Sequence, residues 1–523
     1  MYCRAVLLAL LLVPLNVAAA EPEPEYVNPV RAGDYPDPSV IRVGDDYYAT
    51  ATSSEWGPQF PILHSRDLVN WELKGFAMLE RPEWATSNFW APEIATHDGR
   101  YYIYYTGRNK ENRLALAVAT ADSPTGPYTD QGELVAQEAG SIDAMAFSDQ
   151  EGQRWLVWKE DGNSRKQPTP LWLQRLTDDC LKLTGERKEI LRNDAEWEGQ
   201  LVEGPFIFFR DGYYYMLYAG AGCCGRDCNY AVGVARAQNV EGPWEKYPGN
   251  PILTGNQSWR CPGHGSVVVD PQGRHWFLYH AYAADTFTAT GREMLLDPIT
   301  FDDQGWPRIG HGGGPTVRGK APFNEASRND EASFTDEFDG AMLQTGWLWP
   351  QDRVPLYELT GGALVLTVPD NSREPFTAAV IGRSCTSGDY QATTVIDLTD
   401  SEGGTFAGIA AIGDLDNAIG LAVRRDRAIL WQRRAGREDR PAEVGFPSTG
   451  EFHLRMTAHN GSQFSFAYSR DGQNWNEVGD TLDGSYLPPW DRSIRIALTV
   501  GGAPESAARF EAVTIEAVGR SSK

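Results

Sequence analysis

The segment DGRYYIYYTG, residues 98–107, joins a turn signal to a strand signal. Its Asp-Gly pair is typical of a tight hairpin turn. The tyrosines and the isoleucine that follow belong to residue types that are enriched in β-strands. One segment of this kind predicts a single hairpin, but its recurrence along the chain decides the fold.

The segment recurs with small changes at near-equal intervals. Its five copies are VGDDYYATAT (43–52), DGRYYIYYTG (98–107), EGQRWLVWKE (151–160), DGYYYMLYAG (211–220) and QGRHWFLYHA (272–281). The turn glycines, Gly44, Gly99, Gly152, Gly212 and Gly273, lie 55, 53, 60 and 61 residues apart. An all-strand repeat of this length has the size of a propeller blade with about four strands. Because the spacing is too regular for an irregular β-sandwich, the sequence predicts an all-β protein with a five-bladed β-propeller over residues 27–320.

The repeat stops near residue 320, and a second all-β region follows. Residues 321–333 are polar and rich in turn formers, as a linker would be. Beyond them, the alternating segment FHLRMTAHNGSQFSFAYSRDG (452–472) predicts two strands with a hairpin turn at Asn460-Gly461. We therefore predict a β-sandwich domain over residues 334–519.

The N-terminal residues have the three parts of a secretory signal peptide. Arg4 is basic, residues 5–17 are apolar, and three alanines at 18–20 offer a cleavage site. The apolar run is shorter than a membrane-spanning helix requires, and no later stretch reaches that length. The chain is therefore expected to be secreted or periplasmic, with residues 1–20 as the signal peptide and no membrane span.

Charge excludes one class of partner. The chain carries 47 Lys and Arg against 71 Asp and Glu, which gives a formal net charge of −24. A polyanion is repelled by such a protein. No basic stretch offsets this charge, so nucleic acid is not expected as a partner. A neutral oligosaccharide or polysaccharide is compatible with it.

Six cysteines follow the predicted cleavage site, and the sequence leaves their pairing open. Three of them lie in AGCCGRDCNY (221–230), and the full set is Cys180, Cys223, Cys224, Cys228, Cys261 and Cys385. The cluster lacks the paired spacing of a structural zinc site, and export favours disulfide bonds. One or two local bridges are predicted, with Cys261 as a candidate partner.

Polar residues stand at equivalent places in the five repeats. They lie seven, six, nine, nine and nine residues before the turn glycines, at Asp37, Glu93, Asp143, Glu203 and His264. In a propeller, the starts of the innermost strands converge on the central channel. The repeat register therefore predicts a cluster of four acids and one histidine.

Clustered carboxylates are suited to hydrolysis of a glycosidic bond. One carboxylate must be ionised to take a proton from water, and another must be protonated to donate to the leaving oxygen. A third acid beside the donor helps it to keep its proton by like-charge repulsion. If water attacks directly, the anomeric configuration inverts and the two main carboxyl groups lie about 6.5–9.5 Å apart.

Four segments of the repeats resemble the blade motifs of glycoside hydrolase family 43. They are YPDPSV (35–40), FWAPEI (89–94), GSIDAMAFSDQEG (140–152) and VEGPFIFFRDGYYYMLYAG (202–220), in the order that the family shows. The resemblance extends from about residue 28 to residue 310. It implies an inverting enzyme on a five-bladed propeller that acts mostly on arabinose- and xylose-containing glycans.

The resemblance also implies roles for the clustered residues. By motif match, Asp37 of PDPS is the general base, Asp143 of SID modulates the pKa of the acid and orients it, and Glu203 of VEGP is the general acid. His264 of GHGS is expected on the channel axis, near a water-coordinated structural calcium ion. No cofactor is expected to take part in the chemistry.

Substrate contacts follow from the same resemblance. Arg292 of GREMLLDPI looks like the substrate-binding arginine of the family, because a guanidinium fork suits neighbouring hydroxyl groups. Trp90 of FWAPE resembles an aromatic of the pocket wall, as does Trp56 or Phe60 of EWGPQFPI. Glu93 is predicted to line the same site, as a substrate contact or as a partner of the catalytic acids.

The C-terminal region resembles the concanavalin-like β-sandwich appended to many family 43 xylosidases and arabinofuranosidases. The resemblance covers mainly DEFDG (336–340), LQTGWLWPQD (343–352) and AYSRDGQNWNEVG (467–479). Trp347 or Trp349 either contacts sugar or packs between the domains, and both alternatives stay open at this point.

The expected function is an inverting exo-glycosidase that removes terminal α-L-arabinofuranosyl or β-D-xylosyl residues from plant cell-wall glycans. Ala144 stands where the family often has Pro, a departure that barely affects the chemistry. Phe206 stands where some xylosidase members have His, and with the Cys223-Cys224 loop nearby this leaves the sugar open. The alternative within the family is an endo-acting arabinanase or xylanase, or a galactan-active enzyme. The alternative from another class is a non-catalytic glycan-binding propeller, against which the three intact acids argue.

Overall fold

The structure is a computed structural model in which residues 24–323, 333–370, 372, 374–445 and 450–518 are described. The predicted signal peptide, residues 1–20, lies outside the described residues, as does most of the predicted linker, residues 321–333. Apart from strands, the described part contains two short 3-10 helices, η1 (Gly162–Arg165) and η2 (Glu196–Glu198). The all-β prediction is therefore confirmed. No helix in the described part of the chain is long and apolar enough to cross a membrane.

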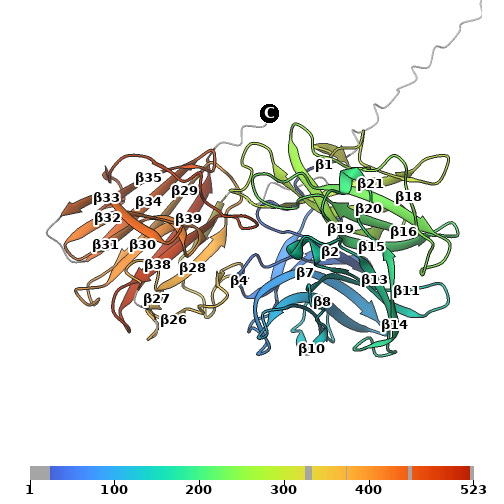
Figure 1. Cartoon of the computed structure of the whole chain (residues 1–523). Helices are drawn as coiled ribbons and strands as arrows, with labels where there is room; N and C mark the ends of the chain where they lie inside the picture. Colours follow the sequence, from blue (N-terminus) through green and yellow to red (C-terminus); the bar gives the residue numbers. More distant parts are fainter. Residues whose placement is uncertain (1–23, 324–332, 371, 373, 446–449, 519–523) are drawn as a thin grey trace, which may run out of the picture.

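The first domain is a β-propeller with five blades of four antiparallel strands each (Figure 1). In chain order the blades are β2 (Ser39–Val43), β3 (Asp46–Thr50), β5 (Gln59–Ser65) and β6 (Glu72–Met78); β7 (Ala85–His97), β8 (Arg100–Asn109), β9 (Leu114–Ala121) and β10 (Thr129–Val135); β11 (Ser141–Ser148), β12 (Arg154–Glu160), β13 (Leu171–Leu176) and β14 (Leu183–Leu191); β15 (Val202–Arg210), β16 (Tyr213–Gly220), β17 (Ala231–Ala237) and β18 (Glu245–Lys246); β19 (Trp259–Val269), β20 (His275–Ala283), β21 (Glu293–Phe301) and β22 (Pro307–Ile309). Neighbouring strands of each blade follow one another in the sequence. The predicted five-bladed propeller is confirmed.

The first strands of the blades form a closed ring around the channel. β2, β7, β11, β15 and β19 each contact the first strand of the next blade, and β19 returns to β2. Outside the blades, β1 (Glu25–Val27) pairs with β23 (Arg318–Lys320) and joins the beginning of the domain to its end. The ring brings residues that are far apart in the sequence to one channel.

The local sequence explains the geometry of the blades. The five repeat glycines turn the chain between first and second strands with φ angles of 65°, 77°, 79°, 85° and 77°, which glycine adopts without a steric penalty. The second strands then supply large side chains to the blade cores. One fully buried aromatic from each second strand illustrates this: Tyr47, Tyr104, Trp158, Tyr215 and Tyr279. Burial of such aromatic side chains contributes strongly to stability.

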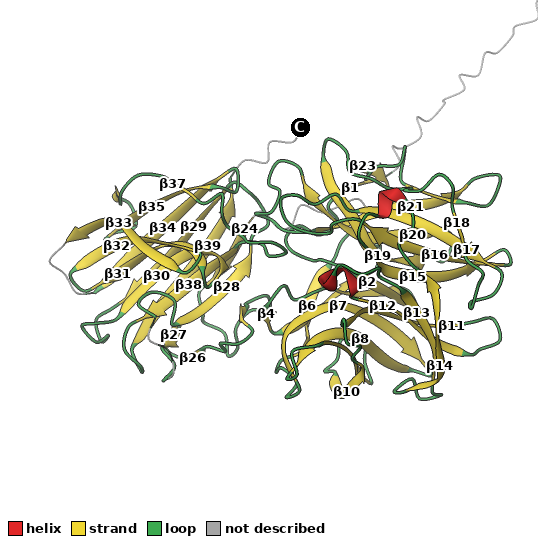
Figure 2. Cartoon of the chain, viewed as in Figure 1, coloured by secondary structure: helices red, strands yellow, loops and turns green. Residues whose placement is uncertain are grey.

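The second domain is a β-sandwich of two sheets (Figure 2). One sheet has the order β26-β27-β39-β29-β34-β35-β36, with β24 beside β39 and β37 beside β35, and the other has the order β28-β38-β30-β31-β32-β33. The strands are β24 (Ser333–Asp336), β26 (Leu356–Leu359), β27 (Leu364–Thr367), β28 (Ala379–Ser384), β29 (Tyr390–Asp397), β30 (Phe406–Asp414), β31 (Asn417–Arg424), β32 (Arg427–Arg434), β33 (Arg437–Gly445), β34 (Glu451–His459), β35 (Gln463–Ser469), β36 (Trp475–Glu477), β37 (Leu482–Asp483), β38 (Arg495–Gly501) and β39 (Ala507–Ala517). The hairpin predicted at Asn460-Gly461 joins β34 to β35, and both of its residues have positive φ.

A short strand pair connects the two domains. β4 (Trp56–Gly57) of the propeller, labelled at the domain boundary in Figure 1, pairs with β25 (Trp349–Pro350) of the C-terminal region. Trp349 therefore packs between the domains, which is one of the two alternatives that the sequence left open. Trp347 lies in the core of the sandwich, where its indole N–H donates to Asp336 at 2.8 Å.

A buried ion pair crosses the same interface. Arg495 of β38 donates to the carboxylate of Asp34 at 3.0 Å, and both side chains are almost completely removed from solvent. Asp34 also accepts a hydrogen bond from the backbone N–H of Arg292 at 3.2 Å. The sandwich is therefore connected directly to the propeller segment that carries a predicted substrate-binding residue.

Candidate active site

Three of the predicted acids and the predicted histidine form one connected cluster. Nδ1 of His264 lies 3.4 Å from Asp37 Oδ1 and 3.9 Å from Asp143 Oδ2. The backbone N–H of Gly204 donates to Asp143 at 3.0 Å, which places Glu203 beside Asp143. The three carboxylates are buried and the histidine is half-buried. Residues from four blades thus meet in one place.

An irregular backbone position recurs at the channel in every blade. Positive φ angles of 52°, 39°, 59°, 56° and 35° occur at Asp37, Ala91, Asp143, Gly204 and His264. In β7, β11, β15 and β19 the pairing with the second strand shifts register at this position, as in a β-bulge. Bulges re-aim side chains and are common beside active sites. The innermost strands are therefore irregular where the acids enter the channel.

Asp37 is held as a carboxylate. The hydroxyl of Thr52 donates to its Oδ2 at 2.6 Å, and the guanidinium of Arg292 donates to its Oδ1 at 3.2 Å. Burial by itself raises the pKa of Asp37, but the charge of Arg292, the neighbouring histidines and the hydrogen bond from Thr52 together lower this pKa to about 2. Asp37 is therefore ionised at neutral pH and able to accept a proton.

The ring of His280, on the second strand of the fifth blade (β20), holds Asp37 in place at the start of the first blade. Nδ1 of His280 accepts the backbone N–H of Asp37 at 3.0 Å. Burial lowers the pKa of His280 well below its usual value, in agreement with a neutral ring. The same ring stacks on Tyr230, with 5.9 Å between the ring centroids. His280 is therefore a positioning residue between Asp37 and the wall of the site.

The pKa of Asp143 is shifted upward, in the opposite direction to the pKa of Asp37. Burial raises its pKa, and the carboxylates of Glu203 and Asp37 add to the rise by repulsion. The charges of His264 and Lys159 oppose these effects without cancelling them, so the pKa of Asp143 is raised to about 6. Two buried acids of one cluster thus differ in charge below about pH 6.

Glu203 is hydrogen-bonded at both of its oxygens. Nζ of Lys159 donates to Oε2 at 2.7 Å, and the hydroxyl of Tyr230 donates to Oε1 at 2.8 Å. Lys159 also donates to Asp161 at 3.0 Å. Burial alone lowers the pKa of Lys159, but the carboxylates of Glu203 and Asp161 raise it above its ordinary value. The ammonium group therefore stays charged, and Glu203 is held in one orientation.

Glu93 is an acid of a different kind. Its side chain is half-buried on β7. Burial raises the pKa of Glu93 to about 8, although a hydrogen bond with Ser39 acts in the opposite direction. Glu93 is therefore neutral at pH 7 and able to donate a hydrogen bond. Its contact with substrate stays a prediction.

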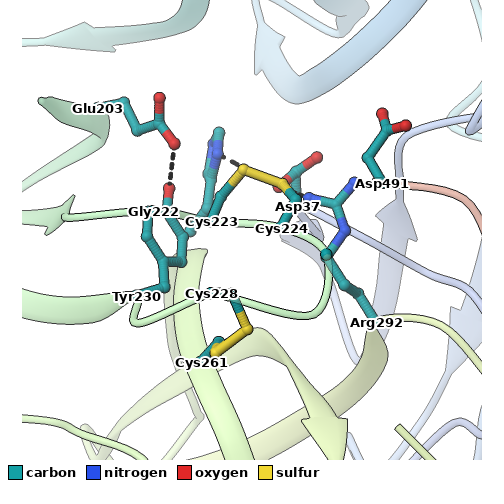
Figure 3. The surroundings of a disulfide bond; sticks show 12 residues. Asp37, Glu203, Gly222, Cys223, Cys224, Cys228, Tyr230, Cys261, Arg292 and Asp491 are labelled. Atoms are coloured by element: carbon teal, nitrogen blue, oxygen red, sulfur yellow. Dashed lines mark hydrogen bonds and ion pairs between the residues drawn. A yellow bond between two sulfur atoms is a disulfide. The ribbon is translucent and has the colours of Figure 1, made fainter. Parts of the chain in front are cut away.

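Arg292 lies near acidic residues of both domains. Besides Asp37, the carboxylates of Asp34 and Asp491 help to raise its pKa, although burial opposes this shift. Asp491 is a buried residue of the sandwich domain, and Figure 3 shows it beside Arg292. The guanidinium thus donates to Asp37 and is also attracted by carboxylates from the propeller and from the sandwich.

The structure differs from the predicted pocket wall at two of its three aromatic positions. Trp90 is half-buried and meets Trp490 of the sandwich edge to face, with 5.8 Å between the ring centroids. Trp490 is 53% exposed. The prediction is wrong for Trp56 and Phe60, because Trp56 is buried in a cluster shared with the sandwich and Phe60 in the core of its own blade. Contacts with a second domain and with neighbouring strands, which EWGPQFPI alone does not reveal, decide their burial.

Two disulfide bonds involve the loop after β16. Cys223 is bonded to its neighbour Cys224, and Cys228 is bonded to Cys261 of β19 (Figure 3). Local bridges that include Cys261 are therefore confirmed, and the pairing that the sequence left open is resolved for these four residues.

Sequence reasoning missed several residues of the cluster. They are Thr52, Lys159, Tyr230, His280 and Asp491. Lys159 and His280 both stand seven residues after a turn glycine, in otherwise apolar strands. A polar residue at this repeat position was a signal that could have identified both of them. Asp491 lies in another domain and carries no comparable signal.

A metal site stays a prediction. Among the residues that the structure describes, no group of three or more His, Cys, Asp and Glu side chains is arranged to hold a metal ion. His264 faces the carboxylates of Asp37 and Asp143.

Comparisons with known proteins agree with this geometry. Residues 26–307 match the family described as "Glycosyl hydrolases family 43", and residues 335–490 match the "Beta xylosidase C-terminal Concanavalin A-like domain". The "Xylosidase/arabinosidase 43B" of Humicola insolens is 29% identical over 508 residues, which cover 89% of this chain and 90% of that protein. The "Non-reducing end alpha-L-arabinofuranosidase BoGH43B" of Bacteroides ovatus is 27% identical over 489 residues, 87% of each chain.

A solved structure extends the likeness to three dimensions. The GH43 BlXynB protein from Bacillus licheniformis has a TM-score of 0.81 and 25% identity, with 94% of this chain and 100% of that chain covered. The family match alone spans more than half of the 523 residues. The chain therefore belongs to glycosyl hydrolase family 43 and is a glycoside hydrolase.

Proposed function

We propose that the protein is an exported exo-glycosidase that inverts the anomeric configuration and removes terminal α-L-arabinofuranosyl or β-D-xylosyl residues from plant cell-wall glycans. The names of the relatives, among them a beta-xylosidase of Bacillus subtilis, support this range of substrates. The observation that carries the mechanism is the contrast between Asp37, with a pKa of about 2, and Asp143, with a pKa of about 6. Direct attack by water requires one ionised and one protonated acid at the same pH.

Asp37 is the proposed general base. Thr52 and Arg292 each bind one of its oxygens, so the carboxylate keeps one orientation. As a water molecule attacks the anomeric carbon, the new C–O bond forms and the proton of the water passes to Asp37. The permanent charge of Arg292 keeps Asp37 ionised before this step.

Glu203 is the proposed general acid, with Asp143 beside it as the site that retains the proton. The pKa of Asp143 is raised to about 6, so Asp143 holds a proton below about pH 6 in the free protein. When the glycosidic oxygen binds, this proton passes through Glu203 to the oxygen as the bond to the anomeric carbon breaks. After the reaction Asp37 holds one more proton and the pair one fewer, and exchange with solvent restores the starting state.

Arg292 and Trp90 are the proposed contacts of the terminal sugar. The guanidinium of Arg292 provides a rigid set of donors for neighbouring hydroxyl groups. Trp90 and the exposed ring of Trp490 lie edge to face at the domain boundary, and aromatic faces of this kind pack against sugar rings. A site walled by both domains favours the end of a glycan over its middle, so we propose exo action.

Substrate and stereochemistry are tested together. We expect release of single pentoses from 4-nitrophenyl α-L-arabinofuranoside or β-D-xyloside and from the corresponding oligosaccharides, assayed side by side. Proton NMR of the first-formed sugar should show inverted configuration. Retained configuration would overturn the mechanism. Release of internal fragments would favour the endo-acting alternative, and sugar binding without hydrolysis would favour a glycan-binding protein.

Export and calcium are proposals of the same kind. We propose that residues 1–20 are removed on export, so mass spectrometry of protein recovered from the periplasm or the medium should find a mature chain that begins at residue 21. We propose that a calcium ion near His264, held through water, is structural. Its removal by a chelator should lower the unfolding temperature and leave the pH dependence of kcat/KM unchanged.

A further inference from the structure

The Cys223–Cys224 disulfide has no ordinary stabilising role. A disulfide stabilises mainly by closing a loop in the unfolded chain, and its effect grows with the length of that loop. This bond joins neighbouring residues, so it closes almost no loop. The Cys228–Cys261 bond spans 33 residues and already connects the segment to β19. Loop closure therefore does not account for the Cys223–Cys224 bond.

The loop that carries the bond is held in place without it. Gly222 and Asn229 exchange two hydrogen bonds, from Gly222 N–H to the Asn229 side chain at 2.8 Å and from Asn229 N–H to Gly222 O at 3.0 Å. The guanidinium of Arg226 donates to the carbonyl of Leu487 in the sandwich at 3.3 Å. These contacts fix the base and the tip of the loop independently of the bond between Cys223 and Cys224.

The bond lies beside the cluster of acids. Cys223 packs against the hydrophobic cluster that contains Tyr230, whose hydroxyl donates to Glu203. Figure 3 shows Glu203, Asp37 and Arg292 among the residues that surround the bond. The bond is therefore near the proposed general acid, at the site where a terminal sugar is proposed to bind.

The bond also presents the right kind of surface. Cys223 and Cys224 are partly exposed, whereas Cys228 and Cys261 are buried. Sulfur is polarizable and a weak hydrogen-bonding partner, so the exposed surface is apolar. Two bonded neighbours form a small ring, and such a ring has little side-chain entropy to lose when a ligand binds. A rigid apolar surface beside charged groups suits the C–H face of a sugar ring.

We propose that the Cys223–Cys224 disulfide is a substrate-binding surface, on which the terminal sugar rests its C–H face while Arg292 and Asp37 engage its polar groups. The proposal rests on the proposed glycosidase function and deepens it, because it assigns a specificity-determining contact to a pair of sulfur atoms. The bond acts on binding of the sugar and takes no part in proton transfer.

Kinetics of the double variant Cys223→Ala/Cys224→Ala test the proposal. KM for a 4-nitrophenyl pentoside and the inhibition constant of the free pentose should both rise about tenfold, the effect of losing roughly 50 Å² of apolar contact. The basic limb of the pH profile should stay in place. Asp227→Ala, an exposed change in the same loop, is the matched control and should leave both constants unchanged. Unchanged constants in the double variant would overturn the proposal.

Protection from reduction tests the contact directly and without catalysis. Wild-type protein is treated with a water-soluble phosphine, and opening of each bond is followed by alkylation and mass spectrometry. Saturating arabinose or xylose should slow the opening of Cys223–Cys224 several-fold, while the buried Cys228–Cys261 bond reports any general effect of the sugar on stability. Equal opening rates with and without both sugars would overturn the proposal. If no glycoside is hydrolysed but a pentose protects the bond, the proposed function fails and the sugar contact stands.

Discussion

At the scale of the residue, two carboxylates of the site each meet a cation of a different type. Asp37 meets Arg292, whose guanidinium stays protonated and binds in a fixed geometry. Glu203 meets Lys159, a point charge on a flexible stem that also binds Asp161. The first pair suits a group that must stay ionised, and the second suits a group whose proton changes during turnover. The proposed roles therefore make different kinetic predictions.

The leaving group should separate the two acids. We expect Glu203→Gln to lower kcat on a natural disaccharide about 10²–10⁴-fold, the range of general acid catalysis. The same variant should lose far less on a 4-nitrophenyl glycoside, because 4-nitrophenolate departs without a proton. Asp37→Asn should slow both substrates by similar large factors, since both need the base. Steady-state kinetics on the two substrates measure this.

A second Glu-Gly-Pro triplet supplies the control for this comparison. Glu241 occupies the same triplet as Glu203 but is exposed on the surface. Glu241→Gln should keep wild-type rates on both substrates. Equal losses of Glu203→Gln on both substrates would contradict its role as the acid.

The pH profile follows from the acid pair. kcat/KM reports groups of the free enzyme, and the free protein must hold one proton on the pair. Asp143, with its pKa raised to about 6, loses this proton as the pH rises, so kcat/KM should fall above about pH 6. The pKa of Asp37, about 2, places the acid limb much lower. A pH-rate profile in buffers of constant ionic strength measures the basic limb.

Lys159 should set the position of that limb. Its ammonium lowers the pKa of Asp143, so Lys159→Met should raise this pKa and move the basic limb upward by about one pH unit. Lys159→Arg keeps the charge and is the control that should leave the limb close to its original position. An unmoved limb in Lys159→Met would show that its charge does not act on the acid pair.

At the scale of the element, the repeat predicted the blades but not their irregularities. The Asp-Gly-like turns and the aromatic strands after them are local signals, so Gly99 and Tyr104 could be placed from the sequence. The positive φ at Ala91 and Asp143 could not, because it arises where adjoining strands lose register around the channel. The sequence placed Glu93 at the start of an innermost strand. In the structure β7 begins eight residues earlier, at Ala85, because the strand continues through its irregular positions.

Gly204 tests the importance of this irregularity. Its φ is 56°, and a Cβ on it would lie 2.7 Å from the ring of His264. Gly204→Ala should therefore displace His264 and Glu203 and lower kcat about 100-fold, as small displacements of catalytic groups do. Gly212→Ala is matched for backbone strain, with φ of 85° and no atom within 4 Å of the added Cβ.

The two glycine variants should differ in activity more than in stability. Gly212→Ala should lower the unfolding free energy by about 1 kcal/mol and keep its activity. Thermal unfolding and steady-state kinetics of both variants measure the difference. Similar activity of the two variants would show that contact with His264 is unimportant.

At the scale of the whole molecule, the sandwich is part of the active-site structure. It supplies Asp491 beside Arg292, and Trp490 against Trp90. It also buries Trp56, which explains why that residue was predicted wrongly. Contacts between segments that lie hundreds of residues apart leave no periodic pattern in the sequence. Both domains could therefore be predicted, but the residues that the sandwich contributes to the site could not.

The ion pair between the domains should show strong coupling. Asp34→Asn leaves the buried charge of Arg495 without its carboxylate and should lower the unfolding free energy by about 3–5 kcal/mol. Replacement of both residues, Asp34→Leu with Arg495→Met, removes both charges and should be much less harmful. A double-mutant cycle by chemical unfolding of the full chain measures the coupling. Additive losses would contradict a direct interaction.

The closure of the propeller has a consequence for biosynthesis. β1 pairs with β23, so residues 25–27 have no strand partner until residues 318–320 have been synthesised. At about 5–20 residues per second, translation of the intervening segment takes roughly 15–60 s. Asp37 emerges early and meets Arg292 only near the end of this interval. The nascent chain thus exposes open blade edges for most of its synthesis, and chaperones or export factors have that time in which to bind it.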